Sequence, residues 1–149
     1  MITNITVSDN VTTGTKGYIY IENPDEQGIN LSMNNSTFSR NRNEVGDGGI
    51  YFENSDLLGD TLFTLNMTNI TFNDNSAYEG SAIYIDSSVR LSDDCCMRSS
   101  TISGNSNSYR GTISLNFYHG IFEITESHFE SNSGRASCFF LHSPSNTPE

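Results

Sequence analysis

The stretch that decides the fold is NITFNDNSAYEGSAIYI, residues 69–85. It opens with β-branched and aromatic residues, passes through an Asn-rich break, and ends with a small-residue step into Ala-Ile-Tyr-Ile. Two other stretches have the same order of residue types, NSTFSRNRNEVGDGGIYF from Asn35 and ESHFESNSGRASCFFL from Glu126. An order of residue types that recurs along one chain is the signature of a repeat architecture.

Tetrads that end in Asn set the period of the repeat. They occupy residues 7–10, 38–41, 72–75, 102–105 and 129–132, and successive Asn residues are 31, 34, 30 and 27 positions apart. An apolar residue lies five positions before each tetrad, and a three-residue word of the Ile-Tyr-Ile type follows each tetrad after a Gly-containing break. The chain therefore consists of five versions of one unit.

Each unit alternates apolar and polar residues with a period of two, which indicates short strands with one buried face. No ten-residue stretch combines a helical apolar rhythm with helix caps. The expected fold is an all-β, right-handed parallel β-helix of about five coils with three short strands per coil, in which equivalent strands stack about 4.8 Å apart. A β-sandwich also has many short strands, but it does not repeat residue types at matched positions.

The stacked coils predict three apolar core columns and one domain. The domain spans residues 1–143, and a polar tail spans residues 144–149. The predicted columns are Ile2-Met33-Met67-Met97-Ile124, Val7-Phe38-Phe72-Ile102-Phe129 and Ile21-Phe52-Ile85-Leu115-Leu141.

Composition and charge exclude several partners. The 149 residues are only 34% hydrophobic and carry a net charge of −11. Nucleic acids and anionic membranes need a cationic surface, so we expect neither as a partner. No apolar run reaches the length of a membrane span, so we expect no membrane insertion by this segment. The first ten residues lack the features of a signal peptide, which favours a mature form or a fragment if the protein is exported.

The repeat resembles that of the polymorphic outer-membrane proteins, which are surface adhesins with an F-x-x-N motif and a G-G-A-I step. Phe38 to Asn41 with Gly48-Gly49-Ile50 is the nearest match, followed by Phe72 to Asn75 with Ser81-Ala82-Ile83. The tetrads that begin at Val7 and Ile102 depart from the motif at its first position. The resemblance implies a non-enzymatic protein that is extracellular or on the cell surface, and it names no ligand.

The column of tetrad asparagines has two interpretations. It could bind a ligand or a cation along the groove. The favoured interpretation is structural: Asn tolerates the left-handed backbone of a tight corner, and stacked amides hydrogen-bond from coil to coil. The column consists of Asn10, Asn41, Asn75, Asn105 and Asn132.

Acceptor motifs for N-linked glycans are dense in the first half of the chain. They occur at Asn4, Asn10, Asn30, Asn34, Asn35, Asn66 and Asn69. An acceptor motif alone does not show that the site is occupied. However, Asn4, Asn35 and Asn69 share one register, so we expect them at one corner of three successive coils, where neighbouring glycans would crowd. N-linked glycans are therefore expected partners.

One outward register repeats a tyrosine with an acid and is a candidate ligand face. Three stacked carboxylates could bind calcium, or a sugar together with the tyrosines. The alternative is a solvated face with a stabilising tyrosine ladder. The face consists of Tyr20 with Glu22, Tyr51 with Glu53, and Tyr84 with Asp86.

Catalytic, metal and cofactor sites are not expected. Many β-helices are polysaccharide lyases or hydrolases, but the seven basic residues here fall in turns at different registers. His119, His128 and His142 have no metal-site or triad spacing. Cys95, Cys96 and Cys138 are odd in number, Cys95 falls in an inward register, and the disulfide state stays open.

Both ends of the repeat array expose a core layer, since a solenoid without caps leaves strand edges open. The ends predict either a segment of a longer solenoid or a protomer that stacks head to tail with its own copies. The end residues are Ile2, Val7, Ile19 and Ile21 at one end, and Phe122, Ile124, Phe129, Phe139 and Leu141 at the other.

Three functions are compatible with these features. The leading hypothesis is an extracellular structural or surface glycoprotein, a scaffold that forms a fibre or part of a longer surface solenoid. The second is an adhesin module that binds carbohydrate or a host surface. The third is a lyase-like enzyme, which the basic residues do not favour.

Overall fold

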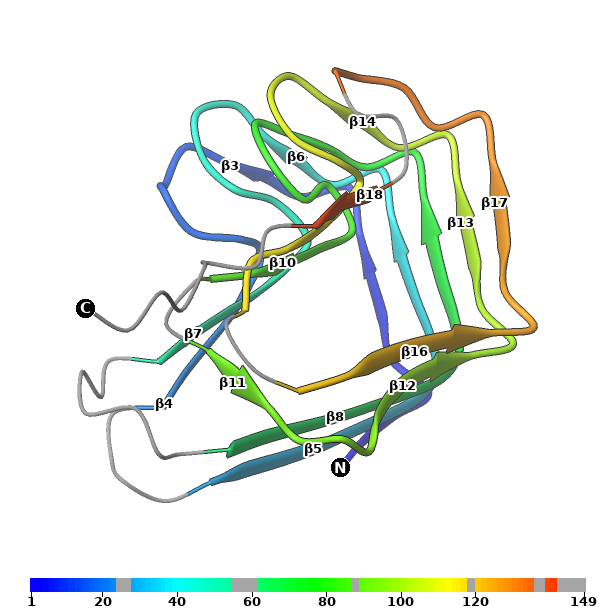
Figure 1. Cartoon of the computed structure of the whole chain (residues 1–149). Coiled ribbons are helices and arrows are strands. Elements are labelled where there is room, and N and C mark those ends of the chain that lie inside the picture. Colours follow the sequence, from blue (N-terminus) through cyan, green and yellow to red (C-terminus); the bar gives the residue numbers. More distant parts are fainter. Residues whose placement is uncertain (24–27, 55–61, 87–88, 118–119, 136–138, 142–149) are drawn as a thin grey trace.

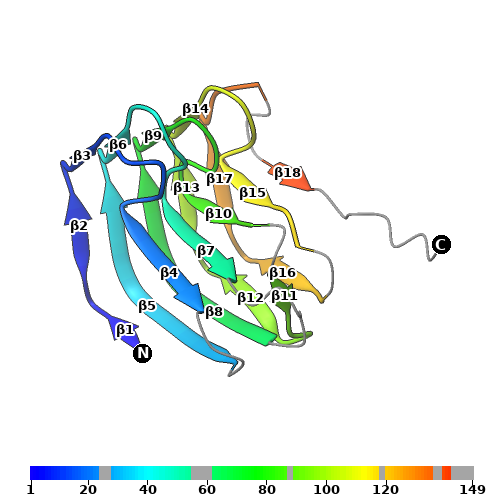
Figure 2. The ribbon, with the colours of Figure 1, turned by 90° about the vertical axis from the view of Figure 1, so that its left-hand side faces the viewer.

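The computed structural model is an all-β parallel solenoid of about four turns (Figure 1). It describes residues 1–23, 28–54, 62–86, 89–117, 120–135 and 139–141, and these residues contain no helix. The expected tail at 144–149 lies outside the described residues. Figure 2 shows the strands following one another along the solenoid axis in chain order.

The longest sheet has nine strands and bends around one corner of the cross-section. Its two long members each join two of the predicted short strands into one, because their pairing resumes directly after the single corner residues Asn35 and Asn69. The strands are β1 (Ile2–Thr3), β2 (Thr6–Ser8), β5 (Ile29–Ser39), β8 (Leu62–Asn73), β11 (Arg90–Leu91), β12 (Cys95–Arg98), β13 (Thr101–Ser103), β16 (Phe122–Thr125) and β17 (His128–Glu130).

Two smaller sheets complete the cross-section. The five-stranded sheet contains β4 (Ile19–Asn23), β7 (Ile50–Asn54), β10 (Ile83–Ile85), β15 (Ile113–Leu115) and β18 (Phe139–Leu141). The four-stranded sheet contains β3 (Val11–Thr12), β6 (Arg42–Asn43), β9 (Ser76–Ala77) and β14 (Ser106–Asn107).

The register expected from the repeat is confirmed. Met33 pairs with Met67 and Phe38 with Phe72 in the longest sheet, and Phe52 pairs with Ile85 in the five-stranded sheet. The other predicted column members pair in the same parallel register, from Ile2 at one end to Leu141 at the other. The core therefore consists of stacked like residues.

The core is most completely buried in the middle of the solenoid. Met67, Phe72 and Ile83 have no exposed surface, whereas Ile2 and Phe129 in the terminal layers are only partly buried. Cys95 is 1% exposed in the register of Leu65, as expected from the alignment. Cys138 lies outside the described residues.

The tetrad asparagines form a hydrogen-bonded ladder at one corner. The Asn75 Oδ1 accepts bonds from the backbone N–H and the Nδ2 of Asn41, both at 3.0 Å. The Asn75 Nδ2 donates to the Phe38 carbonyl at 2.9 Å and to the Asn105 Oδ1 at 2.9 Å. The expected bonding between coils is thus confirmed, and Asn41, Asn75 and Asn105 have no exposed surface.

The expected left-handed backbone lies one residue earlier than predicted. The residues with positive φ are those before the asparagines: Asp9, Arg40, Asp74, Gly104 and Ser131. The prediction that the asparagines themselves need this conformation is therefore wrong. The preceding residue makes the turn, so that the asparagine side chain points into the corner and can bond to the neighbouring coils.

A second left-handed corner interrupts the longest sheet. Asn4, Asn35 and Asn69 have φ values of 55°, 49° and 53°, and Ser99 and Glu126 continue the column. The residue after the corner often contributes a hydroxyl: the Ser100 Oγ accepts from the Ile70 N–H at 3.1 Å. The expected corner position of Asn4, Asn35 and Asn69 is confirmed, so these three acceptor asparagines stack at one corner.

Candidate functional site

The predicted tyrosine face is a stacked ladder on the five-stranded sheet. The ring centroids of Tyr20 and Tyr51 are 5.6 Å apart, and those of Tyr51 and Tyr84 are 4.9 Å apart. Tyr20 is 39% exposed, but Tyr51 and Tyr84 are only 5% and 7% exposed. The ladder is confirmed, and the expectation that this register is an open face is wrong for Tyr51 and Tyr84.

The loops that lead into the five-stranded sheet fold over the tyrosines. A Cβ at Gly80 would lie 2.8 Å from the Tyr84 Cβ, and one at Gly17 would lie 3.1 Å from the Tyr51 Cβ. Only a residue without a side chain allows such an approach. The glycines in the breaks of the repeat were the signal in the sequence for this burial.

A lysine and a glutamate contact the tyrosine ladder at its exposed end. The Lys16 Nζ lies 5.0 Å from the Tyr20 ring centroid and 4.6 Å from that of Tyr51, and it pairs with Glu53. The Tyr20 hydroxyl donates to the Glu53 Oε2 at 2.6 Å. Burial raises the pKa of the Glu53 carboxyl, but the hydrogen bonds from Lys16 and Tyr20 together outweigh burial and bring that pKa below its usual value.

A row of charged residues lies over the ladder, and the alignment of the repeats did not single it out. Lys16, Asp47, Glu79 and Arg110 each precede a strand of the five-stranded sheet by a few residues. Burial raises the pKa of the Asp47 carboxyl to about 7, with a further contribution from the charge of Glu79. Arg110 lies 3.3 Å from the Glu79 carboxylate, and burial also raises the pKa of Glu79.

The other members of the predicted ligand face do not form a cation site. Glu22 is exposed and Asp86 is partly buried. Within the described ranges, no three His, Cys, Asp or Glu side chains are grouped closely enough to hold a metal ion. His128 lies 3.3 Å from Glu130 on the exposed surface, whereas His119 and His142 fall outside the described residues.

The predicted glycan acceptors occupy different environments. Asn4, Asn30, Asn35 and Asn69 are exposed, and Asn34 and Asn66 are partly buried. The Asn69 Nδ2 donates to the Asn35 Oδ1 at 2.8 Å, so the two side chains are neighbours. The Asn10 Nδ2 donates to both Ser8 and Asn41 as the first member of the ladder, and a glycan there would replace one of these donors.

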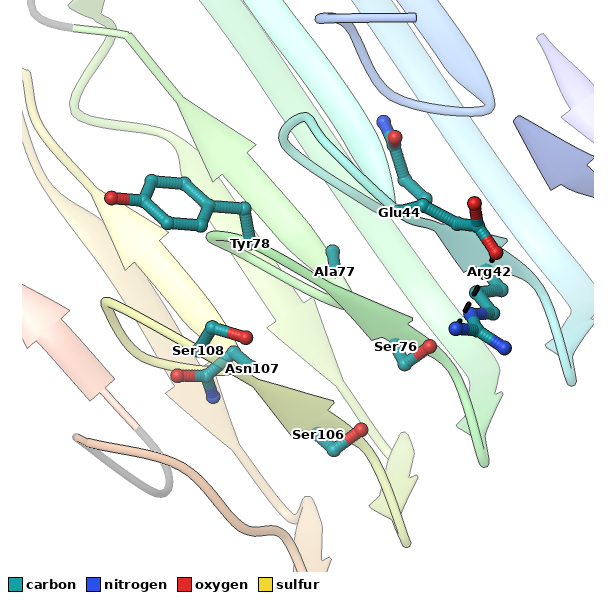
Figure 3. Close-up of a pocket in the computed structure, with 9 residues that line it drawn as sticks. Arg42, Glu44, Ser76, Ala77, Tyr78, Ser106, Asn107 and Ser108 are labelled. Atoms are coloured by element: carbon teal, nitrogen blue, oxygen red, sulfur yellow. Dashed lines mark ion pairs between the residues drawn. The ribbon is translucent and has the colours of Figure 1, made fainter. Parts of the chain in front are cut away.

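A shallow polar groove of about 230 Å³ crosses the four-stranded sheet (Figure 3). Residues 42–44, 76–78 and 106–108 line it, so that three successive repeats contribute equivalent positions. Beside it, the Tyr78 and Tyr109 rings stack with centroids 5.4 Å apart and an interplanar angle of 3°. Tyr78 and Tyr109 occupy non-equivalent positions in their repeats, which is why the aligned repeats did not reveal the pair.

The two end layers place the predicted stacking residues at the edges of the sheets. Ile2, Val7, Ile19 and Ile21 are partly buried at one end, as are Phe122, Ile124 and Phe129 at the other. Phe139 is 40% exposed and lies against Phe129 with ring centroids 4.9 Å apart. The Leu141 backbone pairs with Leu115, and its side chain lies outside the described part of the structure.

Comparison with protein-family models, with curated proteins and with solved structures found no match. Among the described residues there is also no helix that could cross a membrane.

Proposed function

We propose that this chain is a structural segment of an extracellular or cell-surface glycoprotein, a right-handed β-helix of five coils that continues at both ends. It continues either by head-to-tail stacking of copies into a fibre or by pairing with further coils of a longer solenoid. The single observation that carries the proposal is the incomplete burial of the end layers.

The end layers resemble the interior layers in residue type but not in burial. Phe38 and Phe72 have no exposed surface, whereas Val7 and Phe129 in the same column are partly exposed. The outermost strands also pair on one side only, since β1 and β16 are the edges of the longest sheet and β4 and β18 those of the five-stranded sheet. Another coil on either face would bury apolar surface and extend the parallel pairing.

The asparagine ladder gives the stacking a direction. In every step, the carboxamide oxygen accepts bonds from the asparagine one repeat earlier in the chain. Continuing this pattern past the ends makes Asn132 the donor and Asn10 the acceptor. Head-to-tail contacts therefore repeat the ladder, whereas head-to-head contacts would place like groups opposite each other. A heterologous contact that does not close generates a filament.

Charges placed on the end layers test the stacking. The variant with Ile2→Asp and Phe139→Asp puts a carboxylate in each end layer and should shorten the particles seen by electron microscopy and light scattering. The matched control carries Val45→Asp and Leu62→Asp, which add the same charge at exposed lateral positions. A wild-type chain that stays monomeric at high concentration would contradict self-stacking, as would a control that shortens the particles equally.

The surface location is tested through the glycan acceptors. Secretion from a eukaryotic host followed by glycopeptide mass spectrometry should find glycans on at least two sites, with Asn35 or Asn69 among them. Absence of glycans from every acceptor would remove the support that the acceptor motifs give to a glycoprotein.

A further inference from the structure

The groove on the four-stranded sheet has a regular polar floor. Arg42 pairs in register with Ser76, and Ser76 with Ser106, so these three side chains follow one another along the solenoid axis. Figure 3 shows the two serines side by side on β9 and β14, with Tyr78 and Ser108 beyond the ends of these strands. The row ends at the ion pair of Arg42 and Glu44, 3.4 Å apart.

An exposed pair of aromatic rings borders this floor. Tyr78 is 45% exposed and Tyr109 is 39% exposed. Hydrogen bonds between their loops hold the pair in place, since the Tyr109 N–H donates to the Tyr78 carbonyl at 2.9 Å. The guanidinium groups of Arg110 and Arg135 lie 5.5 Å and 5.6 Å from the Tyr109 ring centroid. These contacts restrict the two rings before a ligand binds, which lowers the cost of ordering them on binding.

The chemistry of the groove excludes two classes of ligand. Its lining is mostly hydroxyl, carboxamide and charged groups, so it lacks the apolar pocket that anchors a peptide side chain. The net charge of −11 disfavours a nucleic acid. A flat ring with an apolar face beside a row of donors and acceptors matches a ligand that has both C–H faces and many hydroxyls.

We infer that this groove binds a neutral oligosaccharide, with Tyr78 as the platform for one sugar ring. The Tyr78 ring packs against the C–H face of the sugar, while Ser76, Ser106 and Ser108 hydrogen-bond its hydroxyls. The ion pair of Arg42 and Glu44 supplies a donor and an acceptor at one end of the groove. This activity is additional to the scaffold role and does not depend on it.

A buried acceptor lies at the other end of the groove. Asn107 lines the groove and is 8% exposed, and its Nδ2 donates to the Ser133 carbonyl at 3.2 Å. Its Oδ1 has no hydrogen-bond partner among the described residues. A buried amide oxygen without a partner is costly. This oxygen has almost no accessible surface and lies against Gly134 of the next repeat, so Asn107 closes this end of the groove and leaves the ligand contacts to the serines.

The size of the groove limits the ligand. Its volume of about 230 Å³ lies below the roughly 300–1,000 Å³ of pockets that hold drug-sized molecules, so it accommodates one or two sugar rings. The row runs along the axis, so a longer chain extends past Arg42 or Ser106 over neighbouring repeats. The groove lies on a different sheet from the ladder of Tyr20, Tyr51 and Tyr84.

Binding of neutral oligosaccharides to the full chain tests the inference. A panel of gluco-, xylo-, manno- and chito-oligosaccharides is screened by saturation-transfer NMR, and the best binder is titrated by calorimetry. Tyr78→Ala should weaken its binding by about tenfold or more, because it removes the aromatic platform. Tyr20→Ala removes a tyrosine of similar exposure from another sheet and should leave affinity unchanged. Circular dichroism and melting show whether both variants are folded.

Four outcomes overturn the inference. The first is that no neutral oligosaccharide binds at millimolar concentration, and the second is that wild type and a folded Tyr78→Ala bind with equal affinity. The third is that Tyr20→Ala loses binding while Tyr78→Ala keeps it. The fourth is that only sulfated or uronic-acid oligosaccharides bind. If Tyr78→Ala does not fold, Ser106→Gln replaces it. The longer side chain extends from the floor into the groove, and an unchanged affinity in this variant also overturns the inference.

Discussion

At the scale of single residues, the tetrad asparagines contribute most to the specificity of the fold. Each carboxamide in the middle of the ladder bonds to the repeats on both sides, and its own backbone N–H is satisfied by the next asparagine along the chain. A buried polar network with every member paired specifies one register, and a broken one is costly. The ladder thus resists slippage of one repeat against the next.

Asn75→Ala should destabilise the fold by about 3 kcal/mol or more, because it leaves the Asn41 amides and the Phe38 carbonyl without their buried partners. Chemical denaturation of wild type and variant measures the change in the free energy of unfolding. Asn30→Ala removes an exposed asparagine from β5 and should change that free energy by less than about 0.5 kcal/mol. Equal effects of the two substitutions would show that the ladder contributes little.

At the scale of elements, the breaks before the five-stranded sheet decide how the loops pack. Gly49 precedes β7 with a φ of 66°, and a Cβ there would lie 1.9 Å from the Ala82 carbonyl oxygen. Gly14 lies in the preceding repeat, and a Cβ there would have no atom within 4 Å. Glycines at different positions in the breaks therefore carry very different structural demands.

Gly49→Ala should destabilise the protein by roughly 2–4 kcal/mol, since it adds both backbone strain and a clash with the Ala82 carbonyl just before β10. Gly14→Ala should be neutral or stabilise the fold by up to about 1 kcal/mol, because it restricts only the unfolded chain. Thermal unfolding of the two variants gives the comparison. If the Gly49→Ala and Gly14→Ala proteins have the same melting temperature, the close approach of these loops is disproved.

The charged row over the tyrosine ladder should make stability depend on pH. Burial and the negative charge of Glu79 raise the pKa of Asp47 to about 7 in the folded state, and Asp86 adds a smaller increase. The positive charges of Arg110 and Lys16 lower this pKa but do not offset the increase. The folded protein therefore holds a proton that the unfolded chain releases near the ordinary Asp pKa of 3.8. The resulting stability is fully present below that value and is lost as the pH rises through about 7.

Asp47→Asn should raise the free energy of unfolding at about pH 8 by on the order of 1 kcal/mol, a small effect because solvent partly screens this carboxyl. The substitution should also flatten the decline in stability between about pH 5 and 8. Asp9→Asn is the control. Arg40 lowers the pKa of Asp9, so its contribution is lost only under acid conditions and the slope near neutrality should not change. Melting temperatures across this pH range measure both slopes. A wild-type slope that persists in Asp47→Asn would exclude Asp47 as its source.

At the scale of the whole molecule, stability should be graded along the solenoid axis. Each repeat contacts only its neighbours, so the middle repeats have two packing partners and the outer repeats have one. β8 in the middle pairs with strands on both sides, whereas β1 and β16 are edges of the same sheet. The grading also connects folding to the proposed assembly, because axial contacts would give the end repeats a second partner.

Hydrogen exchange should be slowest in β8 and β10 and faster by a factor of about 100 or more in β1, β2 and β18. Mass spectrometry of exchanged peptides measures this gradient. Under conditions that favour particles, the end strands alone should gain protection. Uniform exchange along the chain would show a single cooperative unit and would contradict the axial gradient.

The sequence by itself determined the period, the strand register and the core columns, because in-register stacking repeats one local pattern at matched positions. Met33 aligns with Met67, and Phe38 with Phe72, when the repeats of the sequence are superimposed, and the same residues pair in the fold. The bonding of the asparagines followed from the same alignment. Only the tertiary structure decided which outward columns are covered: Tyr51 and Tyr84 lie under loops whose lengths and residues differ between repeats. The left-handed turn before each asparagine and the groove beside Tyr78 depend on backbone direction and on packing between these unequal breaks, which a residue-by-residue alignment does not contain.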